Sequence, residues 1–294
     1  MAFVKATKAK SRARIALCGP SGAGKTYTSL RLASGLGEKV AVIDTERGSA
    51  SKYADEFEFD VMELDTFHPQ KYIDGIKEAE AAGYDVLVID SLSHAWMGKD
   101  GVLELHDRAT AKQRTANSFA AWRDVTPIHN QLVDAILQSR LHVIVTMRSK
   151  TEYIQTEENG RKVVKKVGMA PVQRDGMEYE FDIVGDLDTD NNLIITKSRC
   201  RNLSGAVINK PGEETAQIIK DWLTDGVDIE EQRRKEREAT LQRVLEAWET
   251  LSGDVDSFYT WAEKQYRKTK DNLTLSDLQT IEKMLAKKLE EKGA

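Results

Sequence analysis

Four short apolar runs, bounded by polar or turn-forming residues, punctuate the first half of the chain. They lie at residues 15–18, 40–43, 86–89 and 143–145. Runs of this length are typical of strands buried on both faces, as in a parallel sheet. Helical spacing of apolar residues falls between them, at about 25–36, at 69–82 and in a longer segment ending near residue 139. This alternation predicts an α/β fold with a mostly parallel central sheet.

The pattern changes after residue 150, where β-favouring residues flank Asn159 and Gly160. Both turn residues tolerate positive φ, so the pair predicts a β-hairpin. A second hairpin is predicted from strands at 181–187 and 193–197, joined by a turn at 188–192. A short helix then begins after Pro211 and ends before Gly226.

Beyond Gly226 the β-branched residues thin out and charged residues recur at helical spacing. This texture predicts about three helices, at 229–251, 255–268 and 275–292. We interpret Trp248, Phe258, Trp261 and Leu278 as the shared core of a small helical bundle. The expected organisation is a basic flexible arm at 1–14, an α/β core at 15–226 and a helical domain at 227–294.

The charge of the 294-residue chain is unevenly distributed. The total of 43 basic and 48 acidic residues gives a net charge of -5, which argues against a uniformly basic nucleic-acid coat protein. Five basic residues and no acidic one lie in the first fourteen positions, so the remainder carries -10. The two cysteines are too few for a disulfide framework, and no apolar stretch has the length of a membrane span. We therefore expect a soluble, cytoplasmic chain.

The segment after the first apolar run fits the pattern G-x-x-x-x-G-K-[ST]. It reads Gly19, Pro20, Ser21, Gly22, Ala23, Gly24, Lys25, Thr26. Its position between a predicted strand and a predicted helix is the one that phosphate binding requires, because backbone N–H groups and the helix N-terminus then face the phosphates. We expect Lys25 to contact the β- and γ-phosphates and Thr26 to ligate Mg²⁺.

Two other predicted strands end in acidic residues. Asp90 ends the strand at 86–89 and suits the role of the aspartate that orients a magnesium-bound water. It is followed by Ser91 rather than by a glutamate, so the residue that orients the attacking water must come from elsewhere. Glu46 follows the strand at 40–43 and is a candidate, with a plain surface glutamate as the alternative.

Together these residues resemble the RecA-type ATPases, and most closely the phage-encoded AAA-family ATP-binding proteins that include the RecA-like single-strand annealing proteins. The resemblance covers residues 14–223 and rests on the P-loop, the Ile-Asp-Thr-Glu and Val-Ile-Asp-Ser segments and the hairpin beginning at Phe181. It implies that Glu46 is the catalytic glutamate and that Tyr53 packs on adenine. It also implies Mg²⁺-dependent ATP hydrolysis in phage-type DNA recombination or annealing, in the host cytoplasm if the chain is phage-encoded.

The chain departs from the RecA pattern at one position. RecA-type proteins end the strand after the magnesium aspartate with a glutamine that senses the γ-phosphate, whereas here the run continues to Met147 and Arg148. We expect Arg148 to replace the glutamine as sensor. The resemblance also implies a homo-oligomer in which a neighbouring subunit supplies a basic residue, for which Arg174 or the pair Lys165 and Lys166 are candidates beside the alternative of plain solvent exposure.

Two segments are candidates for contact with single-stranded DNA, because each mixes basic with aromatic residues. The first spans 108–123. The second runs from Arg148 to Arg174 and includes Lys150, Arg161, Lys162, Lys165 and Lys166, with three glutamates among them. An ordinary polar surface is the alternative for both, and the basic arm could bind phosphate or dock on a neighbouring copy.

Two other functions fit the same residues. One is a nucleotide-gated interaction protein that recruits a partner, such as a single-strand binding protein, through its C-terminal helices. The other is a small-molecule P-loop kinase, whose arginine-bearing lid would have to come from residues 108–123. A GTPase is disfavoured, because Asn209 and Lys210 are followed by Pro211 and Gly212, which places glycine where guanine recognition needs aspartate.

Overall fold

The computed structural model describes residues 8, 10–112, 118–158, 161–226, 229–252 and 254–293. Residue contacts divide the chain into one unit of residues 11–224 and another of residues 225–294 with the described residues Lys8 and Lys10. The first unit is the α/β core and the second consists of helices. Cys18 and Cys200 are both buried and unpaired. None of the helices within the described ranges is both long and apolar enough to cross a bilayer.

The core is built on one sheet, which contains nine strands among the described residues. In chain order they are β1 (Arg14–Gly19), β2 (Val40–Asp44), β3 (Asp60–Glu63), β4 (Val86–Asp90), β5 (His142–Glu158), β6 (Arg161–Pro171), β7 (Ile183–Leu187), β8 (Asn192–Ser198) and β9 (Val207–Asn209). Their spatial order is β3-β2-β4-β5-β1-β7-β8-β9, with β6 paired to β5. The first six strands in this order are parallel to one another, whereas the pairs β7–β8, β8–β9 and β5–β6 are antiparallel, which confirms the predicted fold class.

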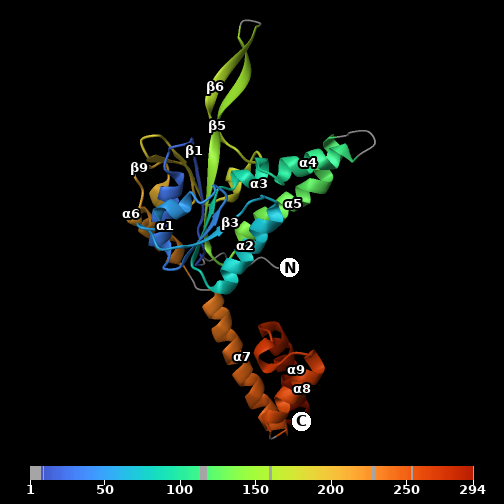
Figure 1. Ribbon diagram of the computed structural model, residues 1–294. Coiled ribbons are helices and arrows are strands. Elements are labelled where there is room, and N and C mark those ends of the chain that lie inside the picture. Colours follow the sequence, from blue (N-terminus) through green and yellow to red (C-terminus); the bar gives the residue numbers. More distant parts are fainter. Residues whose placement is uncertain are drawn as a thin grey trace. The chain divides into compact units, whose positions relative to one another are not determined.

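Helices cover both faces of this sheet. They are α1 (Lys25–Leu36), α2 (Pro69–Ala82), α3 (Ser93–Met97), α4 (Val102–Ala111), α5 (Ser118–Gln138) and α6 (Glu213–Thr224), with 3-10 turns η1 (Ala50–Tyr53), η2 (Met177–Glu180) and η3 (Arg201–Leu203). Alternation along the strands assigns side chains to two cores: Ile15 and Leu17 pack with α1 and α6, whereas Ala16 and Cys18 pack with α2 and α5. Figure 1 shows these two helix layers on either side of the sheet.

Strand β5 is longer than the sequence predicts. We expected a core strand at 143–145 and a separate hairpin after residue 150, but one strand supplies both. It pairs in parallel with β1 as far as Arg148, and from Ser149 onward it pairs antiparallel with β6. In Figure 1 the two strands extend beyond the sheet as a hairpin. The turn residues Asn159 and Gly160 lie outside the described residues.

The last basic residues of the predicted arm belong to the core instead. Arg14 is the first residue of β1 and is buried. Its guanidinium donates to the carbonyls of Ala13, Leu137 and Leu141 and also to that of Ser139. These bonds satisfy the guanidinium, so Arg14 cannot serve as a phosphate contact. Residues 1–7 and 9 of the arm lie outside the described residues.

The C-terminal unit is a small bundle of α7 (Ile229–Ser252), α8 (Asp256–Tyr266) and α9 (Leu275–Gly293), with the 3-10 turn η4 (Lys270–Asn272). Phe258 and Leu278 are fully buried in its core, and Trp248 and Trp261 pack against them. The Trp248 indole N–H donates to Ser257 Oγ at 3.0 Å. The predicted core residues of this bundle are confirmed.

Candidate functional site

The carboxyl ends of four parallel strands meet at one edge of the sheet. Their order there is β2, β4, β5 and β1, and the register pairs Asp44 with Asp90 and Gly19 with Arg148. Ligands bind outside the carboxyl ends of strands in open α/β sheets. A cavity of about 530 Å³ lies at this edge. It is lined by Gly19, Ser21, Gly22, Gly24, Lys25, Thr26, Tyr27, Glu46, Ser49, Tyr53, Asp90, Arg148 and Ser149.

The P-loop connects β1 to α1 and forms one wall of this cavity. Gly22 and Gly24 have φ of 80° and 77°, a left-handed conformation that favours glycine. A side chain on Gly19 would meet the carbonyl oxygen of Leu187 at 2.7 Å, so the loop also needs glycine there. Of the eight motif residues, Pro20 and Ala23 do not line the cavity.

Lys25, the first residue of α1, folds back over this loop. Its Nζ donates to the carbonyls of Gly19 at 3.0 Å and Pro20 at 2.8 Å. Burial lowers the pKa of Lys25, while the carboxylates of Asp90 and Glu46 act in the opposite direction. The ammonium group is therefore held inside the cavity with weak, neutral acceptors that an anionic phosphate would replace.

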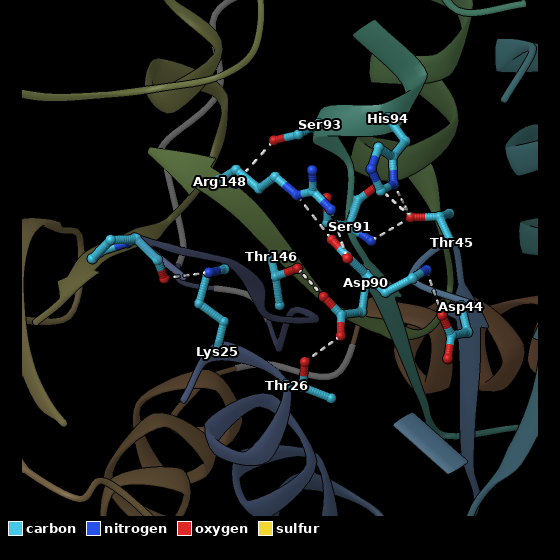
Figure 2. Close-up of polar contacts among 12 residues, drawn as sticks. Lys25, Thr26, Asp44, Thr45, Asp90, Ser91, Ser93, His94, Thr146 and Arg148 are labelled. Carbon is cyan, nitrogen blue, oxygen red and sulfur yellow. Dashed lines mark hydrogen bonds and ion pairs between the residues drawn. The ribbon is translucent and has the colours of Figure 1, made fainter. Parts of the chain in front are cut away.

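Asp90 ends β4 and is buried between two threonine hydroxyls (Figure 2). Thr26 Oγ1 donates to Asp90 Oδ2 at 2.5 Å, and Thr146 Oγ1 on β5 donates to Oδ1. Burial raises the pKa of Asp90, and the two hydroxyl hydrogen bonds oppose that rise. The two described hydrogen bonds of this desolvated carboxylate come from neutral hydroxyls, which compensate its charge less than a bound cation would.

This donor set fits Mg²⁺, which binds oxygen ligands and is commonly held by one or two protein groups together with phosphates. The predicted ligands Thr26 and Asp90 are in direct contact. In the described ranges, no three His, Cys, Asp or Glu side chains come together as a metal cluster, at Asp90 or at any other place. Phosphate and water oxygens would therefore have to complete the coordination of an ion at Asp90.

Glu46 lies just beyond β2, in a turn held by the buried carboxylate of Asp44. Asp44 Oδ1 accepts from the Glu46 N–H at 2.6 Å and Oδ2 from the Ala50 N–H at 3.0 Å. Positive φ at Arg47 and Gly48 completes the turn. The Glu46 side chain reaches the cavity, where Arg148 Nε and an Arg148 terminal nitrogen donate to its two oxygens at 3.0 and 2.6 Å.

Tyr53 lies at the end of η1 and lines the same cavity. Its ring meets Tyr27 edge to face at a centroid distance of 5.4 Å. The Tyr27 hydroxyl donates to Glu56 Oε2 at 2.9 Å. Two aromatic rings thus border the cavity on the side where the predicted adenine contact lies.

Several polar residues of this site carry no recognisable motif. His94 Nδ1 lies 2.6 Å from Thr45 Oγ1, and burial followed by the Arg148 charge lowers the pKa of His94. Ser93 Oγ accepts from the Arg148 N–H at 2.9 Å. Of these side chains only Thr146 directly follows an apolar run, the one at 143–145, whereas Ser93 and His94 lie in α3, a helix that the sequence analysis did not predict.

The predicted DNA contacts are only partly described. Lys150 is exposed, and the side chains of Arg161, Lys162, Lys165 and Lys166 lie outside the described residues. Arg174 is half-buried and lines a different cavity, of about 310 Å³, with Gln173 and Asp186. The structure therefore does not bring Arg174 to the P-loop of its own chain.

The segment at 108–123 is largely engaged in its own contacts. Arg108 pairs with Asp100 at 2.7 Å and Glu104 at 2.5 Å. Trp122 stacks on His106, with 4.2 Å between ring centroids, and also on Trp96. Phe119 is 91% exposed. Arg114 lies outside the described residues. Arg108 and Trp122 are thus already paired or stacked with other residues of the α3–α5 region.

A family model described as an AAA domain matches residues 11–226. No curated protein matches the chain in sequence. A solved structure from Pyrococcus horikoshii OT3, described only as a structural study, is 9% identical and has a TM-score of 0.35. The match covers 68% of this chain and 95% of that chain, and at this score it supports no inference.

Proposed function

Since the chain belongs to the AAA domain family through residues 11–226, we propose that it hydrolyses ATP with Mg²⁺. Membership of this family makes it a nucleotide-binding protein of the P-loop ATPase class. We also propose that it acts on single-stranded DNA in phage-type recombination or annealing. The observation that carries the proposal is the single cavity that gathers Lys25, Thr26, Asp90 and Glu46 beside the P-loop.

The proposed roles follow from what each group can donate or accept. Backbone N–H groups of the P-loop hold the phosphates, and Lys25 exchanges its two carbonyl acceptors for phosphate oxygens. Thr26 and Asp90 would hold Mg²⁺, which when bound neutralises charge on the phosphates. Glu46 orients the attacking water, a positioning task that phosphoryl transfer requires. Tyr53 packs on the base.

Replacing Glu46 with glutamine tests this assignment. E46Q should bind ATP but hydrolyse it at least about a hundredfold more slowly, because general-base residues contribute roughly 10²–10⁴-fold. The matched control is E63Q, since Glu63 ends the neighbouring strand β3 and does not line the cavity. Steady-state phosphate release measures both. Hydrolysis by E46Q at the parent rate would show that another group orients the water.

Support for DNA binding comes from the hairpin of β5 and β6. Seven basic residues lie between Arg148 and Arg174 against three glutamates, in a chain that is otherwise acidic. Local positive charge of this kind supplies phosphate contacts. The segment also contains Tyr153, and tyrosine is a residue type on which bases of single-stranded DNA stack. We further propose that copies of the chain assemble through the ATPase core, which would allow a neighbour to supply a basic residue.

The alternative of a nucleotide-gated interaction protein keeps one supporting observation. In this structure both oxygens of Glu46 are occupied by Arg148, an arrangement that suits slow hydrolysis. The C-terminal bundle would then recruit a partner such as a single-strand binding protein.

The kinase alternative has no such support: of its candidate lid arginines with described side chains, Arg108 pairs with Asp100 and Glu104, Arg123 is exposed, and neither lines the P-loop cavity.

A further inference from the structure

Arg148 occupies the point where β5 leaves the parallel sheet. It is the last residue paired with β1, opposite Gly19, and the next residue, Ser149, pairs with Pro171 of β6. Its N–H donates to Ser93 Oγ at 2.9 Å, and its carbonyl accepts from the Val172 N–H at 2.6 Å. The backbone of Arg148 is therefore fixed at the base of the hairpin, and Figure 2 shows its contact with Ser93.

The side chain of Arg148 makes a two-pronged ion pair with Glu46. Nε donates to Oε1 at 3.0 Å and a terminal nitrogen donates to Oε2 at 2.6 Å. Paired bonds between a guanidinium and a carboxylate are short, charge-assisted and geometrically specific. While this pair persists, both oxygens of the carboxylate already accept from a cation, so Glu46 is poorly placed to accept a hydrogen bond from water.

The same guanidinium faces a second potential partner. Arg148 lines the cavity together with Gly19 and Lys25, which lie where the terminal phosphates of a nucleotide would be held. Its side chain is 42% exposed, whereas that of Glu46 is 26% exposed. A terminal phosphate carries more charge than a carboxylate and presents the same two-oxygen geometry to a guanidinium.

We propose that Arg148 exchanges partners with the nucleotide state: it pairs with Glu46 when the γ-phosphate position is empty and with the γ-phosphate when that position is filled. The exchange makes Arg148 the residue that distinguishes a nucleoside triphosphate from a diphosphate. It also releases Glu46 to orient water only when a triphosphate is present. This inference rests on the proposed ATPase function.

A double-mutant cycle tests the exchange. Titration calorimetry with Mg²⁺ and either ATPγS or ADP is carried out on the full chain and on R148Q, E46Q and the double variant. R148Q should weaken ATPγS binding about tenfold or more, as expected for the loss of a charge-assisted hydrogen bond, and leave ADP binding unchanged. E46Q should tighten ATPγS binding, because the competing partner is removed.

The decisive quantity is how the two substitutions combine. Competition predicts that E46Q tightens ATPγS more when Arg148 is present than in the R148Q background. Simple repulsion between Glu46 and phosphate predicts the reverse, namely that E46Q tightens ATPγS binding more in the R148Q background. Arg148, when present, would already screen that repulsion. Equal or smaller tightening in the presence of Arg148 would overturn the exchange.

Two further arms keep the result interpretable. R148K retains the charge but not the planar guanidinium, so it should discriminate ATPγS from ADP less well than the parent and better than R148Q. A parent-like ratio of ATPγS to ADP affinity in R148K would contradict the proposal, even if R148Q failed to fold. No binding of either nucleotide by the parent chain would instead overturn the proposed ATPase function, and the exchange with it.

Discussion

Asp90 and its two threonine neighbours set the conditions for cation binding. The carboxylate is buried, and its described partners are the hydroxyls of Thr26 and Thr146. Each hydroxyl bond favours the ionised form, against a desolvation that favours the neutral one. Only the ionised carboxylate can hold Mg²⁺, so the pKa of Asp90 should limit activity at low pH.

Thr146→Val removes one of these bonds without changing the volume greatly. The pKa of Asp90 should rise, because a hydrogen bond that favours its ionised form is lost, and such bonds contribute about 1.5–3 kcal/mol. Activity is present above the pKa and lost as pH falls through it, so the acid limb of kcat/KM for MgATP should move up by about one pH unit or more. T215V, which alters a buried threonine of α6, is the control. An unmoved acid limb in T146V would contradict this role of Thr146.

The residues around the nucleotide site differ in how far the sequence predicts them. Lys25, Thr26 and Asp90 belong to spaced motifs whose mechanism requires their position, and the structure brings all three together. Thr146 and Ser93 belong to no motif, because their contribution depends on which strand lies beside β4. The pair between Glu46 and Arg148 joins residues 102 positions apart, a proximity that local sequence cannot express.

Strand β5 shows where prediction of elements succeeds and where it stops. Its apolar segment is a strong local signal and was found, whereas the Asn159-Gly160 pair that predicts a turn lies outside the described residues. The continuation of this strand beyond the sheet was missed, because the polar residues after Arg148 pair with β6 rather than with the core. Strand β9 and helices α3 and α4 were also missed; β9 has only three residues and α3 only five, too few for a periodic pattern.

The start of β5 also contains a pH-sensitive packing contact. His142 Nδ1 accepts from the Ala13 N–H at 3.1 Å, and Arg12 lies 3.2 Å from Nε2. A protonated ring would present N–H donors to donors on both sides. Burial, reinforced by Arg12 and Arg14 and opposed by Asp85, lowers the pKa of His142 to about 4.

We expect this contact to make the core less stable in mild acid. The folded ring is neutral, so its stabilisation is complete above the unfolded pKa of about 6.5 and is lost as pH falls toward 4, by up to roughly 3 kcal/mol. H142N keeps an acceptor for Ala13 but does not titrate. The measurement is denaturant unfolding of the parent and H142N between about pH 7 and about pH 4, a window that spans the unfolded and folded pKa values of the histidine. Parallel loss of stability in parent and H142N would exclude His142 as the cause.

At the scale of the whole molecule, charge is the feature that whole-chain composition conceals. The net charge of -5 comes from an acidic body and locally basic segments, of which the hairpin segment between Arg148 and Arg174 is one. The N-terminal segment has less positive charge available for phosphate contacts than its sequence indicates. The guanidinium of Arg14 donates to backbone carbonyls, and Lys8 pairs with Asp225 at 3.0 Å. The hairpin is therefore the surface on which the proposed DNA contact depends most.

The proposed action on single-stranded DNA predicts that DNA bound at this hairpin alters hydrolysis, because Arg148 belongs both to the base of the hairpin and to the lining of the P-loop cavity. The most direct measurement is the ATPase rate of the full chain against single-stranded DNA at several salt concentrations. We predict stimulation that weakens as salt rises, because phosphate contacts release counterions. R161E/K162E should lose the stimulation but keep the basal rate, whereas K287E/K288E on α9 should keep both. Equal rates with and without DNA at low salt, together with no DNA binding, would contradict the account.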